Sequence, residues 1–67
     1  MSLSYIDRMK TELDELQIRK SKLDVFLANL KENLSDKEIE LMQKQSKIMG
    51  EYARVLGERI DYALFKS

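Results

Sequence analysis

Seven side chains of this 67-residue chain could bind a ligand through charge, hydrogen bonds or ring stacking. Arginine can clamp a phosphate with two parallel hydrogen bonds, and lysine can add a point charge. Tyrosine can stack on a base or donate its hydroxyl, and an amide can read a base edge or a ribose. The candidate phosphate contacts are Arg59, Arg8, Lys22 and, behind them, Lys20. The candidate stacking and polar contacts are Tyr5, Tyr52 and Gln45.

The composition argues against most kinds of catalytic chemistry. The chain has no Cys, His, Pro or Trp, which excludes disulfides, zinc clusters and catalysis by histidine or cysteine. No carboxylate pair or glycine-rich loop marks a catalytic centre. We therefore predict that the protein is not an enzyme and holds neither a cofactor nor a metal.

The charge balance argues against nucleic-acid polymers and membranes as partners. Lysine and arginine number 12, as do aspartate and glutamate, so the formal net charge is zero. The one basic cluster, Arg19-Lys20-Ser21-Lys22, is most often a solvated face, and a neutral chain does not attract duplex nucleic acid. Charged residues make up 36% of the chain, too many for a spanning segment, and nothing resembles a signal peptide. We predict a cytoplasmic protein.

A heptad pattern predicts a first helix over residues 4–31. Helix-forming residues dominate, and Ser4 is a good N-cap. Apolar residues then recur at alternating steps of three and four, as in the seam of a coiled coil, with one break at Lys20. The seam is Ile6, Met9, Leu13, Leu16, Lys20, Leu23, Leu27 and Leu30.

A turn over residues 32–34 separates this helix from a second one over residues 35–65. Asn33 tolerates the left-handed conformation that ends helices. Ser35 and Glu38 form a capping box, and Leu34 with Ile39 forms a hydrophobic staple. This combination is the most specific local signal in the chain, and it predicts where the second helix begins.

The second helix has an apolar face that is two stripes wide. One stripe is Leu41, Ile48, Val55 and Tyr62, and the other is Met42, Met49, Leu56 and Ala63. Between them runs a polar row, which is Gln45, Tyr52 and Arg59. A short turn makes the two helices antiparallel, and one neighbouring helix cannot cover both stripes. We predict an all-α fold, with residues 1–67 forming one antiparallel two-helix hairpin that assembles into a homo-oligomeric helical bundle.

The polar residue inside the first seam has two possible roles. Lys20 should fall near Gln45 and Ser46 in an antiparallel hairpin. It could fix the register of the helices, with its stem buried and its ammonium in water. It could instead supply charge to a ligand cleft between protomers. Both readings stay open.

Arg59, near the open end of the hairpin, likewise has either a structural or a ligand-binding role. It should fall near Tyr5, Ile6 and Arg8. It could set the register of an assembly, or it could clamp a phosphate in a cleft that repeats by symmetry. The heptad-spaced Gly50 and Gly57 are likewise either a site of close helix approach or two tolerated surface glycines.

One pattern of residues runs through nearly the whole chain. The pattern is Tyr5-Ile6-Asp7-Arg8-Met9, Lys22-Leu23, Phe26, Leu34-Ser35, Leu41, Gln45, Met49, Tyr52, Leu56 and Arg59-Ile60. It resembles very short phage proteins labelled crAss-phage-related, with the spacing in the second helix the most distinctive part. The resemblance implies a phage or prophage origin and a helical hairpin, and it brings no established chemistry.

The segment from Leu34 to Met42 is similar to the start of the second helix in the anti-CBASS cyclic-nucleotide sponge. That sponge is a small phage hairpin that oligomerises and sequesters immune signalling nucleotides. Its binding tyrosine and lysine do not carry over, because Lys31 and Ser46 stand at the matching positions. Short homo-oligomeric phage hairpins also act against Thoeris defence, whose signals are cyclic ADP-ribose derivatives.

Two functional hypotheses follow. In the first, the protein is a phage counter-defence sponge that sequesters a nucleotide-type bacterial immune signal, of the cyclic oligonucleotide or cyclic ADP-ribose class, without turnover. In the second, it is a structural or regulatory coiled-coil hairpin that oligomerises and docks on a host protein through its spare apolar stripe.

Overall fold

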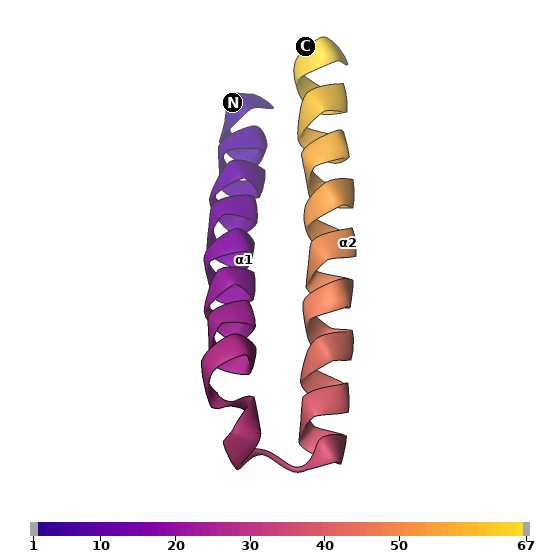
Figure 1. Cartoon of the computed structure of the whole chain (residues 1–67). Helices are drawn as coiled ribbons and strands as arrows, with labels where there is room; N and C mark the ends of the chain where they lie inside the picture. Colours follow the sequence, from indigo (N-terminus) through magenta and orange to yellow (C-terminus); the bar gives the residue numbers. More distant parts are fainter. Residues whose placement is uncertain (1, 67) are drawn as a thin grey trace.

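The computed structural model describes residues 2–66 and consists of two long helices joined by a short turn. Helix α1 spans Ser2–Leu30, a 3₁₀ turn η1 spans Lys31–Asn33, and helix α2 spans Asp36–Lys66. The helices run antiparallel, so both ends of the chain lie at the same end of the molecule (Figure 1). The predicted two-helix hairpin is confirmed. Helix α1 starts two residues before the predicted position, so Ser4 lies inside the helix instead of capping it.

The capping box predicted at the start of α2 is present. The Ser35 backbone N–H donates to Glu38 Oε1 at 2.9 Å, and the Glu38 N–H donates to Ser35 Oγ at 3.2 Å. The Ile39 N–H also donates to the Ser35 carbonyl at 3.0 Å. The first two bonds satisfy amide groups that the first turn of a helix leaves without partners, and the third is the first backbone bond of the helix. The bond from the Ser35 N–H, with a smaller contribution from the Ser35 hydroxyl, holds the pKa of the Glu38 carboxyl below its ordinary value of 4.5.

The turn itself differs from the prediction in one respect. No residue within 2–66 adopts a positive φ, so Asn33 does not end α1 in the left-handed conformation. The three residues of η1 instead tighten the end of the helix into a 3₁₀ turn, which redirects the chain without that strain.

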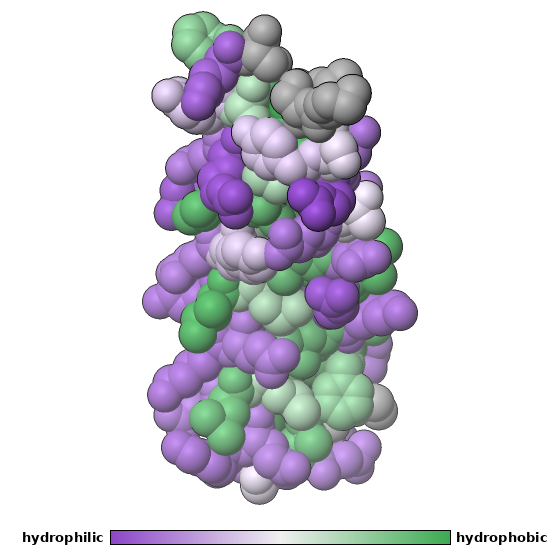
Figure 2. Space-filling view, turned by 180° about the vertical axis from the view of Figure 1, so that it is seen from behind, coloured by the Kyte–Doolittle hydropathy of each residue, from purple (hydrophilic) through white to green (hydrophobic). Residues whose placement is uncertain are grey.

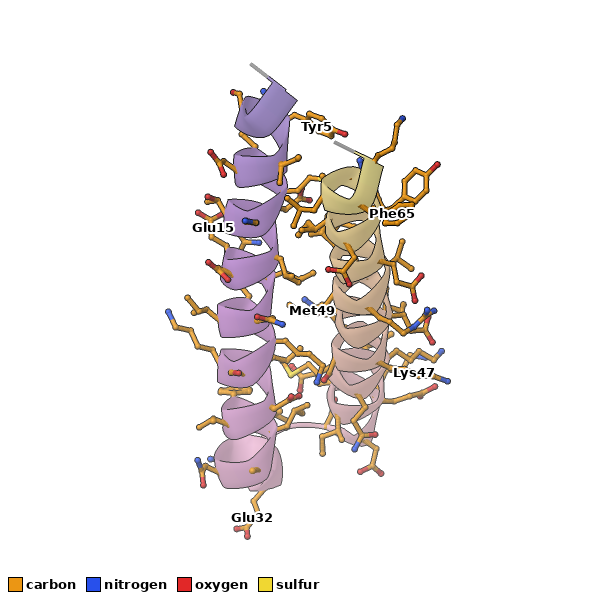
Figure 3. All side chains as sticks on the ribbon, turned by 90° about the horizontal axis from the view of Figure 1, so that it is seen from above. Tyr5, Glu15, Glu32, Lys47, Met49 and Phe65 are labelled. Carbon is orange, nitrogen blue, oxygen red and sulfur yellow. The ribbon has the colours of Figure 1, made fainter. Side chains whose placement is uncertain are left out.

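The core is a single seam along the facing sides of α1 and α2. Its buried members are Ile6, Met9, Leu16, Leu56, Ile60 and Ala63. Met42 and Met49 are half-buried on the same side of α2, and Met49 points between the helices in Figure 3. Glu15 and Lys47 point outwards in that view. One of the two predicted stripes of α2 therefore packs on α1.

The other stripe of α2 remains at the surface. We name Leu41, Ile48, Val55 and Tyr62 the exposed stripe, because their exposed fractions run from 42% at Val55 to 64% at Tyr62. Apolar side chains also reach the surface among hydrophilic ones on the face drawn in Figure 2. One protomer covers only half of the apolar width of α2.

The hairpin is far from spherical, which explains the small core. Its principal extents are 48 × 14 × 13 Å and its radius of gyration is 15.2 Å, against about 11 Å for a compact domain of this length. Its accessible surface is 5295 Å², whereas a compact protein of 7.9 kDa exposes about 4,400 Å².

The capping box gives the first prediction. Ser35→Ala should lower the stability by about 1 kcal/mol, since an alanine cannot accept the Glu38 N–H bond. Thermal unfolding followed by circular dichroism measures the change. Ser21→Ala is the control, because Ser21 is exposed in the middle of α1. An equal melting temperature for Ser35→Ala and wild type would contradict the capping role.

A second prediction is that the contribution of the Glu38 carboxylate to the stability of the folded protein depends on pH. The pKa of Glu38 is lower in the folded than in the unfolded protein, so its contribution is present above about pH 4.5 and is lost as the pH falls through the folded value. Melts of wild type and Glu38→Gln between pH 7 and pH 3 should therefore converge at the acid end, because the amide of the variant does not titrate.

The two glycines of α2 differ in their surroundings, which gives a third prediction. A Cβ added at Gly57 meets no atom within 4 Å, whereas one at Gly50 would lie 3.2 Å from Lys20 Cε. Gly57→Ala should therefore stabilise the protein by about 1 kcal/mol through helix propensity alone. Gly50→Ala should raise the stability by less, because the side chain of Lys20 must shift. Thermal melts of the two variants test this order.

Candidate functional site

The polar row of α2 (Gln45, Tyr52 and Arg59) lies on one flank of the seam, between the buried and the exposed stripes. The Tyr52 hydroxyl donates a hydrogen bond to the carboxylate of Glu12 on α1. This bond raises the pKa of Tyr52 above 10.0, with smaller contributions from burial and from the charge of Glu12. The charge of Arg59 acts in the opposite direction, which places its guanidinium in the same electrostatic environment. Glu12, Tyr52 and Arg59 thus form one polar group on this flank.

The cation of this group is available to a ligand. Arg59 is exposed, and the ion pairs within residues 2–66 include neither Arg59 nor Arg8. Tyr52 keeps 42% of its surface exposed although its hydroxyl is held by Glu12. A ring that is fixed at its hydroxyl and keeps part of its surface exposed can stack on another ring. The arrangement combines a guanidinium and an oriented aromatic ring.

A second polar group lies in the middle of the hairpin, around Lys20. Lys20 Nζ is 2.8 Å from Asp24 Oδ2, and Ser46 Oγ of α2 donates to the other oxygen of the same carboxylate. The bonds from Lys20 and Ser46 lower the pKa of Asp24. Lys20 is placed beside Gly50 and linked to Ser46 through Asp24, whereas the sequence placed it near Gln45 and Ser46. Its ammonium is engaged within the hairpin, as a register-fixing residue would be.

The remaining candidates are spread along the molecule. Lys22 lies with Asp14, Gln17, Ile18 and Ser21 around a shallow, open depression on α1 alone. Tyr5 is 44% exposed and lies at the same end of the hairpin as Phe65 (Figure 3). Successive members of the polar row are seven residues apart, or about 10 Å along the helix. One chain therefore does not gather the candidates into one pocket, and their binding roles stay predictions.

Two site residues were missed from the sequence, Glu12 and Asp24. Glu12 stands seven residues after Tyr5, on the flank of α1 that faces the polar row. Asp24 stands four residues after Lys20, which is the spacing of a helical ion pair. Both signals were present, but an exposed acidic residue in a helix has many possible partners.

Residues 2–66 hold neither a candidate metal site nor a candidate membrane span. No group of three or more acidic, histidine or cysteine side chains could hold a metal ion there. Within that range neither helix contains an apolar stretch that could cross a membrane.

The fold places the chain among small all-α hairpin proteins. The chain belongs to the Sequestin family, whose model matches residues 3–62. The comparisons with curated proteins and with solved structures give no match. The family match supports the sponge-like relationship expected from the sequence, and the name indicates sequestration of a ligand rather than its turnover.

The hydrogen bond from Tyr52 to Glu12 gives a further prediction. Glu12→Gln should lower the pKa of Tyr52 towards 10.0, since the amide accepts a bond but carries no charge to oppose ionisation of the phenol. NMR titration of labelled tyrosines measures it residue by residue. Glu15→Gln is the control, because Glu15 pairs with Arg19 on its own helix. An unchanged Tyr52 titration would show that the charge of Glu12 does not act on this phenol in solution.

Proposed function

We propose that this protein is a phage counter-defence sponge that binds a nucleotide-type bacterial immune signal and keeps it from its receptor without chemical turnover. The ligand class is a cyclic oligonucleotide or a cyclic ADP-ribose derivative, and the protein acts as a homo-oligomer in the cytoplasm of the infected host. The observation that supports the proposal is that Arg59 has no ion pair in residues 2–66 and that its charge acts on the phenol of Tyr52, whose hydroxyl is held by Glu12.

The two side chains match the two halves of a nucleotide. A guanidinium binds phosphate through two hydrogen bonds in a plane, and a tyrosine ring stacks on a base. Glu12 fixes the tyrosine hydroxyl before any ligand arrives, which reduces the entropy lost on binding. Arg8 and Lys22 would add positive charge, with Lys20 behind them, while Tyr5 and Gln45 would complete the stacking and polar contacts.

The overall charge favours a small ligand over a polymer. Affinity for nucleic-acid polymers comes largely from many phosphate contacts, and it needs a continuous basic surface. This chain is neutral overall, and its exposed cations on α1 and α2 alternate with carboxylates in pairs such as Arg54 with Glu58. A single unpaired arginine can anchor one phosphate without attracting a duplex.

The second candidate function is docking on a host protein as a structural or regulatory hairpin. The exposed stripe of α2 favours it, since an unpartnered apolar face is typical of protein interfaces. In that case variants of Val55 or Tyr62 would abolish capture of one host protein, and Arg59 would be dispensable.

Isothermal titration with cyclic dinucleotides, cyclic trinucleotides and cyclic ADP-ribose isomers tests the sponge. Wild type should bind one of these classes, and Arg59→Ala should lose at least tenfold in affinity with its oligomeric state unchanged. Arg54→Ala is the matched control, because Arg54 pairs with Glu58 on the same helix and should be dispensable. The bound compound should be recovered unaltered by mass spectrometry.

Two results would contradict the proposal. The absence of binding to all three ligand classes would remove the nucleotide sponge and leave the docking hairpin. Dissociation of the oligomer by Arg59→Ala would instead assign Arg59 to the assembly.

A further inference from the structure

We propose that two copies of this chain pack antiparallel along the exposed stripes of their α2 helices, and that each ligand site combines Arg59 of one copy with Gln45 of the other. The interface follows from the hairpin itself. The composite site rests in addition on the proposed function.

The exposed stripe is complementary to itself when a second copy is reversed. Its four residues are evenly spaced, so antiparallel pairing about its midpoint sets Leu41 against Tyr62 of the partner and Ile48 against Val55 of the partner. All four positions then find apolar partners at once. An interface of this kind is isologous and closes with two copies.

The charges beside the stripe fit the same arrangement. On the side away from the polar row, Lys44 and Glu58, which pair with Glu40 and Arg54 on their own helix, fall opposite each other across the two copies, twice by symmetry. Glu51 meets its own copy near the axis, and the two oppositely charged pairs offset that cost. Exposed pairs of this kind contribute little affinity but select the antiparallel direction.

The surface excess has the size of an interface. The hairpin exposes about 900 Å² more than a compact protein of its mass. A stable protein interface buries about 800 Å² on each partner. A second copy packed on the exposed stripe would bury most of this excess surface. Both apolar stripes of α2 would then be covered, one by α1 and one by the second copy.

The same pairing brings the polar rows of the two copies next to each other. In one chain Gln45 and Arg59 are fourteen residues apart, or about 21 Å along α2, too far for one small ligand to touch both. In the reversed pair, Arg59 falls opposite Gln45 of the partner, and Tyr52 falls opposite its own copy on the axis. The row lies on the flank of α2 that faces Glu12 of α1, so it lines the concave side between α1 and the partner's α2. Two equivalent crevices result, each with an arginine, an amide and a nearby tyrosine.

Cysteine crosslinking tests the interface. The chain has no native cysteine, so only the introduced residues can form a disulfide. Ile48→Cys/Val55→Cys should form a closed covalent dimer on mild oxidation, since each cysteine meets the other type across the axis. Neither single variant should crosslink, because like positions are too far apart for a disulfide. Ile18→Cys/Val25→Cys is the matched control, with the same spacing and similar exposure on α1. Crosslinking of the single variants, or none with the double variant, would overturn the arrangement.

Complementation tests the composite site. Arg59→Ala and Gln45→Ala should each lose binding alone. Mixed in equal amounts, they should regain about a quarter of the wild-type sites, because only the mixed dimer has one crevice with both side chains intact. The probe is the ligand class that wild type binds in titration. Recovery of no sites would overturn the shared site.

The outcomes separate the two proposals. A covalent dimer with no ligand for wild type would leave the interface standing and remove the sponge. Ligand binding by wild type without the expected crosslink would leave the sponge standing and remove this interface.

Discussion

The structure depends on a difference between its two helices in the width of their apolar faces. Helix α1 presents one apolar seam and, outside it, the exposed residues Ile18 and Val25, whereas α2 presents two stripes of four residues each on adjacent faces. A neighbour can bury one stripe of a helix, so half of the apolar width of α2 stays in water in a single hairpin. The polar row runs along the boundary between the covered and the uncovered half, which is where side chains can be both oriented and accessible.

The two polar groups of the hairpin do different things. Asp24 ties Lys20 of its own helix to Ser46 of the other, and this fixes how far one helix slides along its partner. The Tyr52–Glu12 bond also crosses between helices, but it leaves the tyrosine ring and the neighbouring Arg59 exposed. The first group satisfies its charges internally. The second leaves Arg59, a cation without an ion pair in residues 2–66, exposed at the surface.

Much of the fold could be predicted from the sequence because its signals are local. Steps of three and four gave the α1 seam, and the Ser35–Glu38 spacing gave the start of α2. The conformation predicted for Asn33 was wrong, since a 3₁₀ turn satisfies the helix end equally well. The site was harder to predict. Whether Lys20 meets Gln45 or lies beside Gly50 depends on the rotation and sliding of two helices, to which the heptad pattern is insensitive.

Sedimentation equilibrium of the wild type at tens of micromolar, with Ile48→Glu beside it, measures whether the exposed stripe of α2 drives self-association. Wild type should have a mass at least twice that of the 7.9 kDa chain, and the glutamate variant should be a folded helical monomer. A wild-type protein that sediments as a stable single chain would show that one hairpin tolerates its uncovered stripe, and the account would be wrong.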